Sequence, residues 1–130
     1  MDTNIVTFEM YKGKIRKQIS LLDEKKKYVN LLSVYDMLVC ERMAKSLITK
    51  LINEGFERVE ATTVAENACL SLMCLTDEFF SPVFSDVDSL MRTLTSEDIL
   101  KVVNEYNLLR KEYMGFDRLN NIELENIKKN

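Results

Sequence analysis

The side chains that could do chemistry in this sequence are mainly carboxylates. Asp86, Asp88, Glu97 and Asp98 form a small acidic cluster, and paired carboxylates can carry out acid–base catalysis or bind a cation. The sequence contains no histidine, which removes the commonest general base and metal ligand near neutral pH. Each carboxylate falls in the expected first turn of a helix, where negative charge complements the helix dipole and the free N–H groups. We therefore interpret the cluster as helix capping and predict that the protein is not an enzyme.

The cysteines do not predict metal or disulfide chemistry. Cys69 and Cys74 lack the C-x2-C spacing of a zinc half-site, and no second pair exists. Together with Cys40 they are odd in number and lie among Leu and Met, which is typical of reduced cysteines that serve as small apolar side chains. The three glycines lie too far apart to form a phosphate-binding loop. We expect no cofactor and no bound metal.

The composition is that of one folded, mainly helical domain. The 130 residues are 46% hydrophobic and 30% charged, with three Gly and one Pro. This length suits a single core, and breakers are too few for broad disorder. No apolar run approaches the roughly 20 residues that cross a bilayer, and the polar N-terminus does not resemble a signal peptide. We predict a location in the cytoplasm.

Charge is distributed unevenly along the chain. The net charge is −3, but residues 1–30 carry seven basic and four acidic residues, whereas residues 31–130 carry 11 basic and 17 acidic ones. A basic segment such as Lys25, Lys26 and Lys27 can contact phosphate. The pI near 5.1 nevertheless argues against nucleic acid as the main partner.

The N-terminal residues 1–22 are expected to begin the fold as a short β-hairpin. Two alternating runs flank Gly13, which supplies the positive φ of a tight turn. A polar helix interrupted by Gly13 is the alternative. The following charged stretch, Asp23 to Asn30, has little periodicity and is interpreted as a solvated linker or the exposed start of a helix. The residues expected on one side of the hairpin are Val6, Phe8 and Met10.

Two long helices are expected next. Ser33 with Asp36 resembles a capping box, and Gly55 is the expected stop of the first helix. The second is predicted to open at Thr63, with Glu66 three residues later, and it is apolar nearly all round, as a central helix would be. The inward face expected for the first helix consists of Val34, Met37, Cys40, Ala44, Leu47, Ile48, Leu51 and Ile52.

Two closely spaced capping signals predict a corner in the chain. Pro82 prevents a continuous helix, and Ser85 and Thr95 are each followed three residues later by Asp. A short helix should therefore lie across the bundle, followed by a long helix over residues 96–113 that ends before Gly115. The apolar faces expected for these two helices are Val87, Leu90, Met91 and Leu94, then Ile99, Val102, Val103, Tyr106, Leu109 and Tyr113.

The candidate partner-binding residues are apolar. Phe79 and Phe80 are consecutive in a Pro-containing loop and cannot both point inward on an ordinary helical face, so at least one is expected to be exposed or to cover another element. The alternative is that both close the end of the core. We predict a single helical domain over residues 1–115 and a weakly structured tail over residues 116–130. A second candidate surface in that tail consists of Phe116, Leu119 and Ile122.

Several short motifs give the sequence a family resemblance. They are Tyr-Lys-Gly-Lys at residues 11–14, Cys-Leu-Thr-Asp-Glu at 74–78, Pro-Val-Phe-Ser at 82–85, and Leu-Thr-Ser-Glu-Asp-Ile at 94–99 with the later Tyr106. In this order the sequence resembles small tail assembly chaperones of long-tailed bacteriophages and prophages. Phe79 and Phe80 depart from this pattern, because they replace an expected glycine-containing turn. Residues 23–30 resemble an insertion.

The resemblance implies a non-enzymatic role in virion assembly. Such a protein would bind the tape-measure protein, a long coiled-coil-like client, and keep it soluble in the host cytoplasm until tail-tube subunits assemble around it. It could also form a homo-oligomer. Two alternatives remain: a small structural head–tail or tail component of the particle, and a helical regulatory or anti-defence protein that binds a host factor or DNA through Lys25, Lys26 and Lys27.

Overall fold

The structure is a computed structural model of the chain. It describes the backbone of residues 8–21 and 23–129, and the side chains of residues 8–21, 23 and 25–115. The described part is mainly α, as predicted, but it also contains a four-stranded antiparallel sheet. The elements are β1 (Glu9–Tyr11), β2 (Lys14–Leu21), β3 (Asp23–Asn30), α1 (Val34–Asn53), α2 (Arg58–Cys74), β4 (Leu75–Asp77), α3 (Val87–Thr93) and α4 (Ser96–Lys129).

The predicted β-hairpin is confirmed as β1 and β2. Lys12 and Gly13 form its two-residue turn with φ values of 52° and 77°, the positive angles that tight hairpins require. Its expected apolar side is only partly correct, because Phe8 is buried whereas Met10 is 64% exposed. Val6 lies outside the described residues.

The prediction of a linker or helix start at residues 23–30 is wrong, because these residues form β3. This strand pairs with β2 on one side and β4 on the other, so it is part of the sheet and not a peripheral insertion. Tyr28 and Val29 are buried, and Lys27 is buried with its ammonium paired to Asp23. A lysine can pack its methylene groups in this way while its ammonium group pairs with a carboxylate. A strand in the sheet can therefore have a highly charged sequence, and the sequence pattern does not reveal it.

The first long helix is largely as expected. Ser33 caps α1, because its hydroxyl accepts a hydrogen bond of 3.1 Å from Asp36 N. Gly55, with φ of 102°, follows the helix end. Val34 is an error in the predicted inward face, since it is 80% exposed. It is the first residue of α1.

The second helix, α2, is central as predicted. It contacts α1, α3, α4 and β3, and its buried Ala61 and Ala65 pack in the cluster shared with α1, whereas Ala68 packs in the cluster shared with the sheet. The predicted start at Thr63 is wrong: α2 begins at Arg58, and the Thr63 hydroxyl donates to the Val59 carbonyl inside the helix. A threonine can make this contact one turn back as well as cap a helix. The alanines that are no more than 1% exposed are Ala61, Ala65 and Ala68.

The predicted corner is also present. Thr95 and Asp98 form a reciprocal capping box at the start of α4, with both hydrogen bonds at 3.1 Å. The cap of α3 is one residue later than predicted, because Asp86 and not Ser85 accepts a hydrogen bond from Ser89 N, at 2.7 Å.

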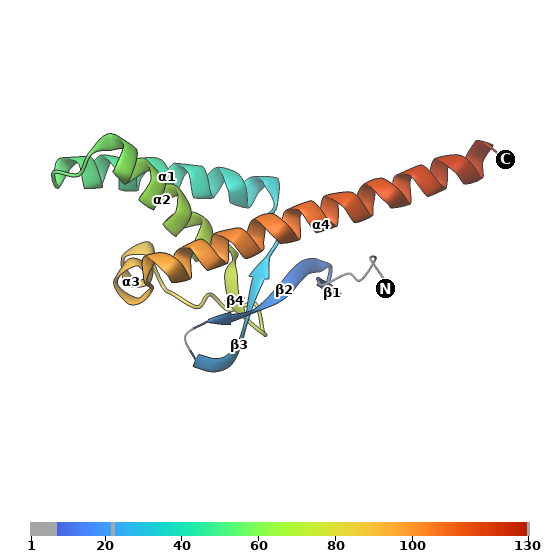
Figure 1. The fold of residues 1–130 in the computed structure, drawn as a ribbon, viewed down its shortest axis with the longest axis horizontal. Helices are drawn as coiled ribbons and strands as arrows, with labels where there is room; N and C mark the ends of the chain where they lie inside the picture. Colours follow the sequence, from blue (N-terminus) through green and yellow to red (C-terminus); the bar gives the residue numbers. More distant parts are fainter. Residues whose placement is uncertain (1–7, 22, 130) are drawn as a thin grey trace.

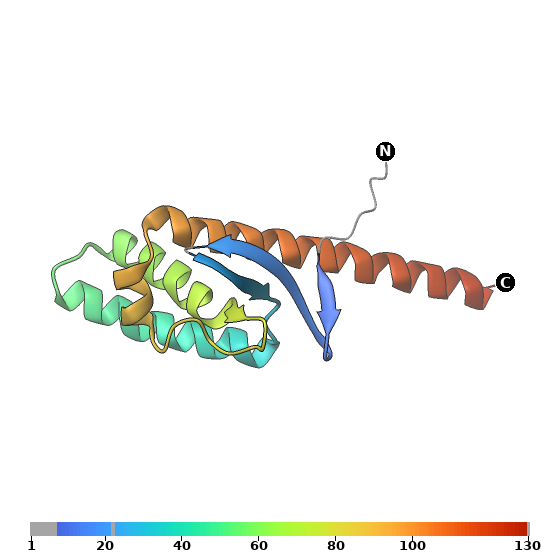
Figure 2. The same ribbon diagram turned by 90° about the horizontal axis from the view of Figure 1, so that it is seen from below.

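The last helix, α4, crosses the molecule and then leaves it. Its predicted end at Gly115 is wrong, since the backbone stays helical to Lys129. The C-terminal part of α4 projects well beyond the other elements (Figures 1 and 2). The division of the chain at residue 115 stays a prediction.

Three core clusters join the described elements. The first lies between the sheet and α2, α3 and α4, the second lies between α1 and α2, and the third joins the hairpin to α4 through Phe8, Ile15 and Leu109. The buried residues of the first are Ile19, Leu21, Val29, Ala68, Cys74, Leu75, Leu90, Leu94, Val102 and Tyr106. The buried residues of the second are Cys40, Ala44, Leu47, Leu51, Ala61, Ala65 and Cys69.

Candidate partner-binding surface

The turn after β4 places the side chains of the two consecutive phenylalanines in different environments. Oδ1 of Asp77 accepts hydrogen bonds from Phe79 N at 2.8 Å and from Ser81 N at 2.9 Å. Phe80 N donates to the Asp77 carbonyl at 3.2 Å. In this turn Phe79 is 77% exposed, whereas Phe80 is half-buried. One phenylalanine of the pair is therefore exposed, as the sequence predicted, and the other covers part of the hairpin.

Phe80 has an unusual backbone. Its φ is +66°, in the left-handed region where a non-glycine residue costs on the order of 1–3 kcal/mol. The side chain has compensating contacts, because its ring stacks on Tyr11 with centroids 5.8 Å apart and an interplanar angle of 20°. The hairpin thereby holds the turn, although the two aromatic residues are distant in sequence.

Arg16 of β2 is the centre of this arrangement. It is buried, and its guanidinium lies 4.0 Å from the ring centroid of Tyr28, 4.6 Å from that of Tyr11 and 4.7 Å from that of Phe80. Its Nη1 donates to the Glu78 carbonyl at 2.8 Å, and its Nε pairs with the Glu9 carboxylate. A guanidinium is suited to this position because its plane stacks on rings while its edge donates hydrogen bonds.

Two lysines flank the aromatic residues. Lys12 Nζ lies 5.4 Å from the ring centroid of Tyr11, and Lys14 Nζ lies 4.8 Å from that of Phe80. Both lysines are exposed, and neither forms an ion pair with the side chains that the structure describes. We call the set Tyr11, Lys12, Lys14, Phe79 and Phe80 the hairpin–turn surface.

A cleft of about 650 Å³ adjoins the hairpin–turn surface. Lys14 and Phe80 line it on one side, and its other walls come from the start of α1, the end of α2 and the loop before α3. Apolar side chains that line it include Leu72, Met73, Pro82 and Phe84. The cleft gives the surface a recess in which an apolar side chain of a partner can be buried.

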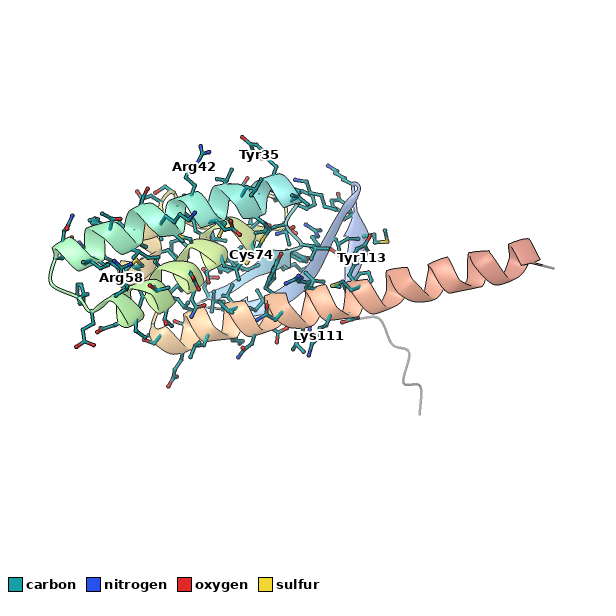
Figure 3. All side chains as sticks on the ribbon, turned by 90° about the horizontal axis from the view of Figure 1, so that it is seen from above. Tyr35, Arg42, Arg58, Cys74, Lys111 and Tyr113 are labelled. Carbon is teal, nitrogen blue, oxygen red and sulfur yellow. The ribbon has the colours of Figure 1, made fainter. Side chains whose placement is uncertain are left out.

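Other exposed apolar side chains occur on α1. Val34, Tyr35 and Leu38 are exposed near its start, and Figure 3 shows Tyr35 and Arg42 pointing away from the fold on the outer side of this helix. A separate groove of about 490 Å³ lies between α1, α2 and α4. Sequence reasoning placed Val34 in the core and did not identify this face.

The two predicted binding sets differ in what the structure says of them. Phe79 and Phe80 lie beside the hairpin, and four neighbours that the sequence analysis did not assign to partner binding complete their surroundings: Tyr11, Lys12, Lys14 and Arg16. The Tyr-Lys-Gly-Lys turn was the available signal for three of these. The side chains of Phe116, Leu119 and Ile122 lie outside the described residues, so their role stays a prediction.

The acidic cluster has structural partners. Asp86 caps α3, the Asp98 carboxylate accepts a hydrogen bond from Thr95 N in the capping box of α4, and Asp88 forms an exposed ion pair with Arg92 at 2.8 Å. The hydrogen bond from Arg92 lowers the pKa of the Asp88 carboxyl. Within the described residues, no group of three or more Cys, Asp or Glu side chains is placed to hold a metal ion.

The three cysteines are buried and reduced. Burial raises the pKa of the Cys69 thiol to about 11, and it also raises the pKa values of Cys40 and Cys74. Because the thiolate is the reactive form, these side chains act as apolar packing groups in the native state.

The Lys25–Lys27 run does not form one basic patch. Lys25 and Lys26 are exposed, but Lys27 is buried and paired with Asp23. Hydrogen bonding to Lys27 lowers the pKa of the Asp23 carboxyl, so part of the positive charge of this run is neutralised locally.

The fold defines a class of protein: a mainly α protein in which helices pack on an antiparallel sheet made of three N-terminal strands and β4. No family model matches the sequence, and no curated protein matches it. Among solved structures, the chain is similar to the tail assembly chaperone of bacteriophage HK97, with a TM-score of 0.51 and 15% sequence identity over 75% of this chain and 87% of that one. The resemblance that the sequence motifs indicated is therefore confirmed for the fold.

No helix in the described part of the chain is both long enough and apolar enough to span a membrane.

Proposed function

We propose that this protein is a phage tail assembly chaperone that binds the tape-measure protein and keeps it soluble during tail assembly, without catalysis. The observation that carries the proposal is the fold likeness to the chaperone of bacteriophage HK97. It is supported by Phe79, a large apolar side chain that the turn after β4 holds in solvent. An exposed aromatic ring beside the exposed Tyr11 and next to an apolar cleft is suited to serve as an anchor for a protein partner.

The proposed client fits this surface physically. A tape-measure protein is expected to expose long amphipathic helices before the tail tube covers them, and a groove beside an aromatic residue is a common way to bind such a helix. The projecting part of α4 carries Phe116, Leu119 and Ile122, and it extends the proposed contact or joins copies into an oligomer. The site of action is the cytoplasm of the bacterial host.

Co-expression tests the proposal. The protein is produced together with the long coiled-coil reading frame that lies downstream in its own genome, and the soluble fraction is examined by pull-down and size-exclusion chromatography with light scattering. We expect the client to become soluble and to co-purify. If the client is equally insoluble with and without the protein, and does not co-purify, the chaperone role is rejected. Retention of the protein in purified virions would instead support a structural role.

A further inference from the structure

We infer that the hairpin–turn surface selects a helix whose apolar stripe is flanked by acidic residues. This inference rests on the proposed function and specifies the chemistry of the partner segment. It depends on the way in which apolar and charged groups are combined around Phe79.

The apolar part of the surface is fixed before a partner binds. Asp77 accepts two backbone hydrogen bonds within the turn, and Arg16 contacts the Phe80 ring and donates to the Glu78 carbonyl. The backbone of Phe79 is therefore fixed by contacts on both sides of it in sequence. Little backbone freedom remains to be lost there on binding, which favours affinity.

The hairpin side of the surface carries two exposed lysines, whereas the turn side carries Asp77 and the exposed Glu78 next to Phe79. Glu9 pairs with the buried Arg16, whereas Lys12 and Lys14 are exposed without an ion pair to any described side chain. Both ammonium groups lie over the rings of Tyr11 and Phe80, next to the turn that displays Phe79. Carboxylates on a bound helix would gain two positively charged partners, and lysines on it would be repelled.

The adjoining cleft favours an apolar stripe between those carboxylates. Its wall includes Lys14 and Phe80, so the cleft and the charged rim share residues. A partner helix that places leucines toward Phe79 and the cleft can place its acidic positions toward Lys12 and Lys14. Leucines at positions i, i+3 and i+4 lie on one face of the partner helix, and acidic residues at the positions beside that face can reach the two lysines.

Two synthetic peptides test the inference on the full-length protein. They are stapled helices of equal length with the same leucine stripe, one flanked by glutamates and the other by lysines, and their affinities are measured by fluorescence anisotropy. We expect the glutamate peptide to bind about tenfold more tightly at low salt, and this preference to shrink as salt screens the charges. The double variant Lys12→Glu/Lys14→Glu should reverse the preference.

A matched pair of lysines elsewhere on the sheet tests whether the effect of charge reversal is specific to the hairpin–turn surface. Lys25 and Lys26 are exposed on β3, and Lys26 lies near Ser20, about 20 Å along β2 from Lys14 at the usual rise per strand residue. Lys25→Glu/Lys26→Glu should leave the preference for the glutamate peptide unchanged, whereas Phe79→Ala should weaken both peptides. Far-UV circular dichroism and urea unfolding establish that all variants are folded.

Several outcomes would overturn the inference. The inference is wrong if the two peptides bind equally, if the lysine peptide binds more tightly, or if neither peptide binds. An equal effect of the two charge-reversal variants would also overturn it. If the wild-type protein self-associates, loses this in Lys12→Glu/Lys14→Glu and binds no peptide, the surface is assigned to a second copy. If the peptide preference is absent but the client is captured in co-expression, the inference is rejected and the chaperone proposal is retained.

Discussion

The two ends of the molecule are stabilised in different ways. At the helical end, defined as the α1–α2 interface, small and aliphatic side chains such as Ala65, Cys69 and Leu47 pack directly against one another. At the sheet end, defined as the β1–β2 hairpin with the turn after β4, a buried arginine, stacked rings and backbone hydrogen bonds hold the structure, and Phe79 stays in solvent. The comparison indicates that the helical end supplies stability, while the sheet end uses polar contacts to position an apolar surface.

Truncation at the helical end should produce the largest loss of stability. Leu47 is buried between α1 and α2, and Leu47→Ala should lower the free energy of unfolding by about 2–5 kcal/mol, because it removes apolar burial and leaves a cavity. Urea unfolding measures this. Binding of the client by the folded fraction should stay normal, and a selective loss of binding would break the proposed division between the two ends.

Arg16 should affect both properties. Arg16→Met keeps an apolar stem but removes the contacts of the guanidinium with three rings and its hydrogen bond to the Glu78 carbonyl. We expect a stability loss of about 2–3 kcal/mol and weaker client binding, because the turn is no longer held. Arg16→Lys keeps the charge and serves as the matched variant, with partial recovery of both.

Amide hydrogen exchange separates these effects of Arg16. The amide protons of Phe79 and Ser81 donate to Asp77, and Arg16→Met should accelerate their exchange, relative to the wild type, by a larger factor than that of the α2 amides. Uniformly faster exchange across the molecule would show that Arg16 contributes only to global stability.

Alkaline pH should destabilise the helical end. The pKa of the Cys69 thiol is raised by burial from 9.0 to about 11, so the folded state holds its proton more tightly than the unfolded state. The resulting stability is fully present below pH 9 and is lost as the pH rises through 11. Urea midpoints between pH 8 and pH 11 should fall less in Cys69→Ala than in the wild type. Parallel pH profiles would show that another group is responsible.

The sequence predicted elements whose signals are local. The Lys12-Gly13 turn, the Ser33 cap and the Thr95–Asp98 capping box each depend on residues within four positions of one another, and each is present. Tertiary contacts decided the rest. β3 was hidden because Lys27 is buried only through its pairing with Asp23, and the start of α2 was misplaced because Thr63 hydrogen bonds within the helix.

The candidate surface was predictable only in part. Two adjacent phenylalanines in a loop with Pro82 indicated exposure, and Phe79 is indeed in solvent. No sequence pattern showed that Arg16 would lie against Phe80, because that contact arises from β2 and β4 both pairing with β3. The residues that position the anchor are therefore visible only in the folded chain.

A pair of phenylalanine variants tests the central claim most directly. Phe79 and Phe56 are both exposed, but Phe56 lies in the α1–α2 loop, far from the hairpin in Figures 1 and 2. Stability and capture of the co-expressed client are measured for Phe79→Ala and Phe56→Ala. We predict that each changes the free energy of unfolding by no more than about 0.5 kcal/mol, and that only Phe79→Ala reduces client capture, by about tenfold or more. Full capture by Phe79→Ala, or an equal loss in Phe56→Ala, would contradict the account.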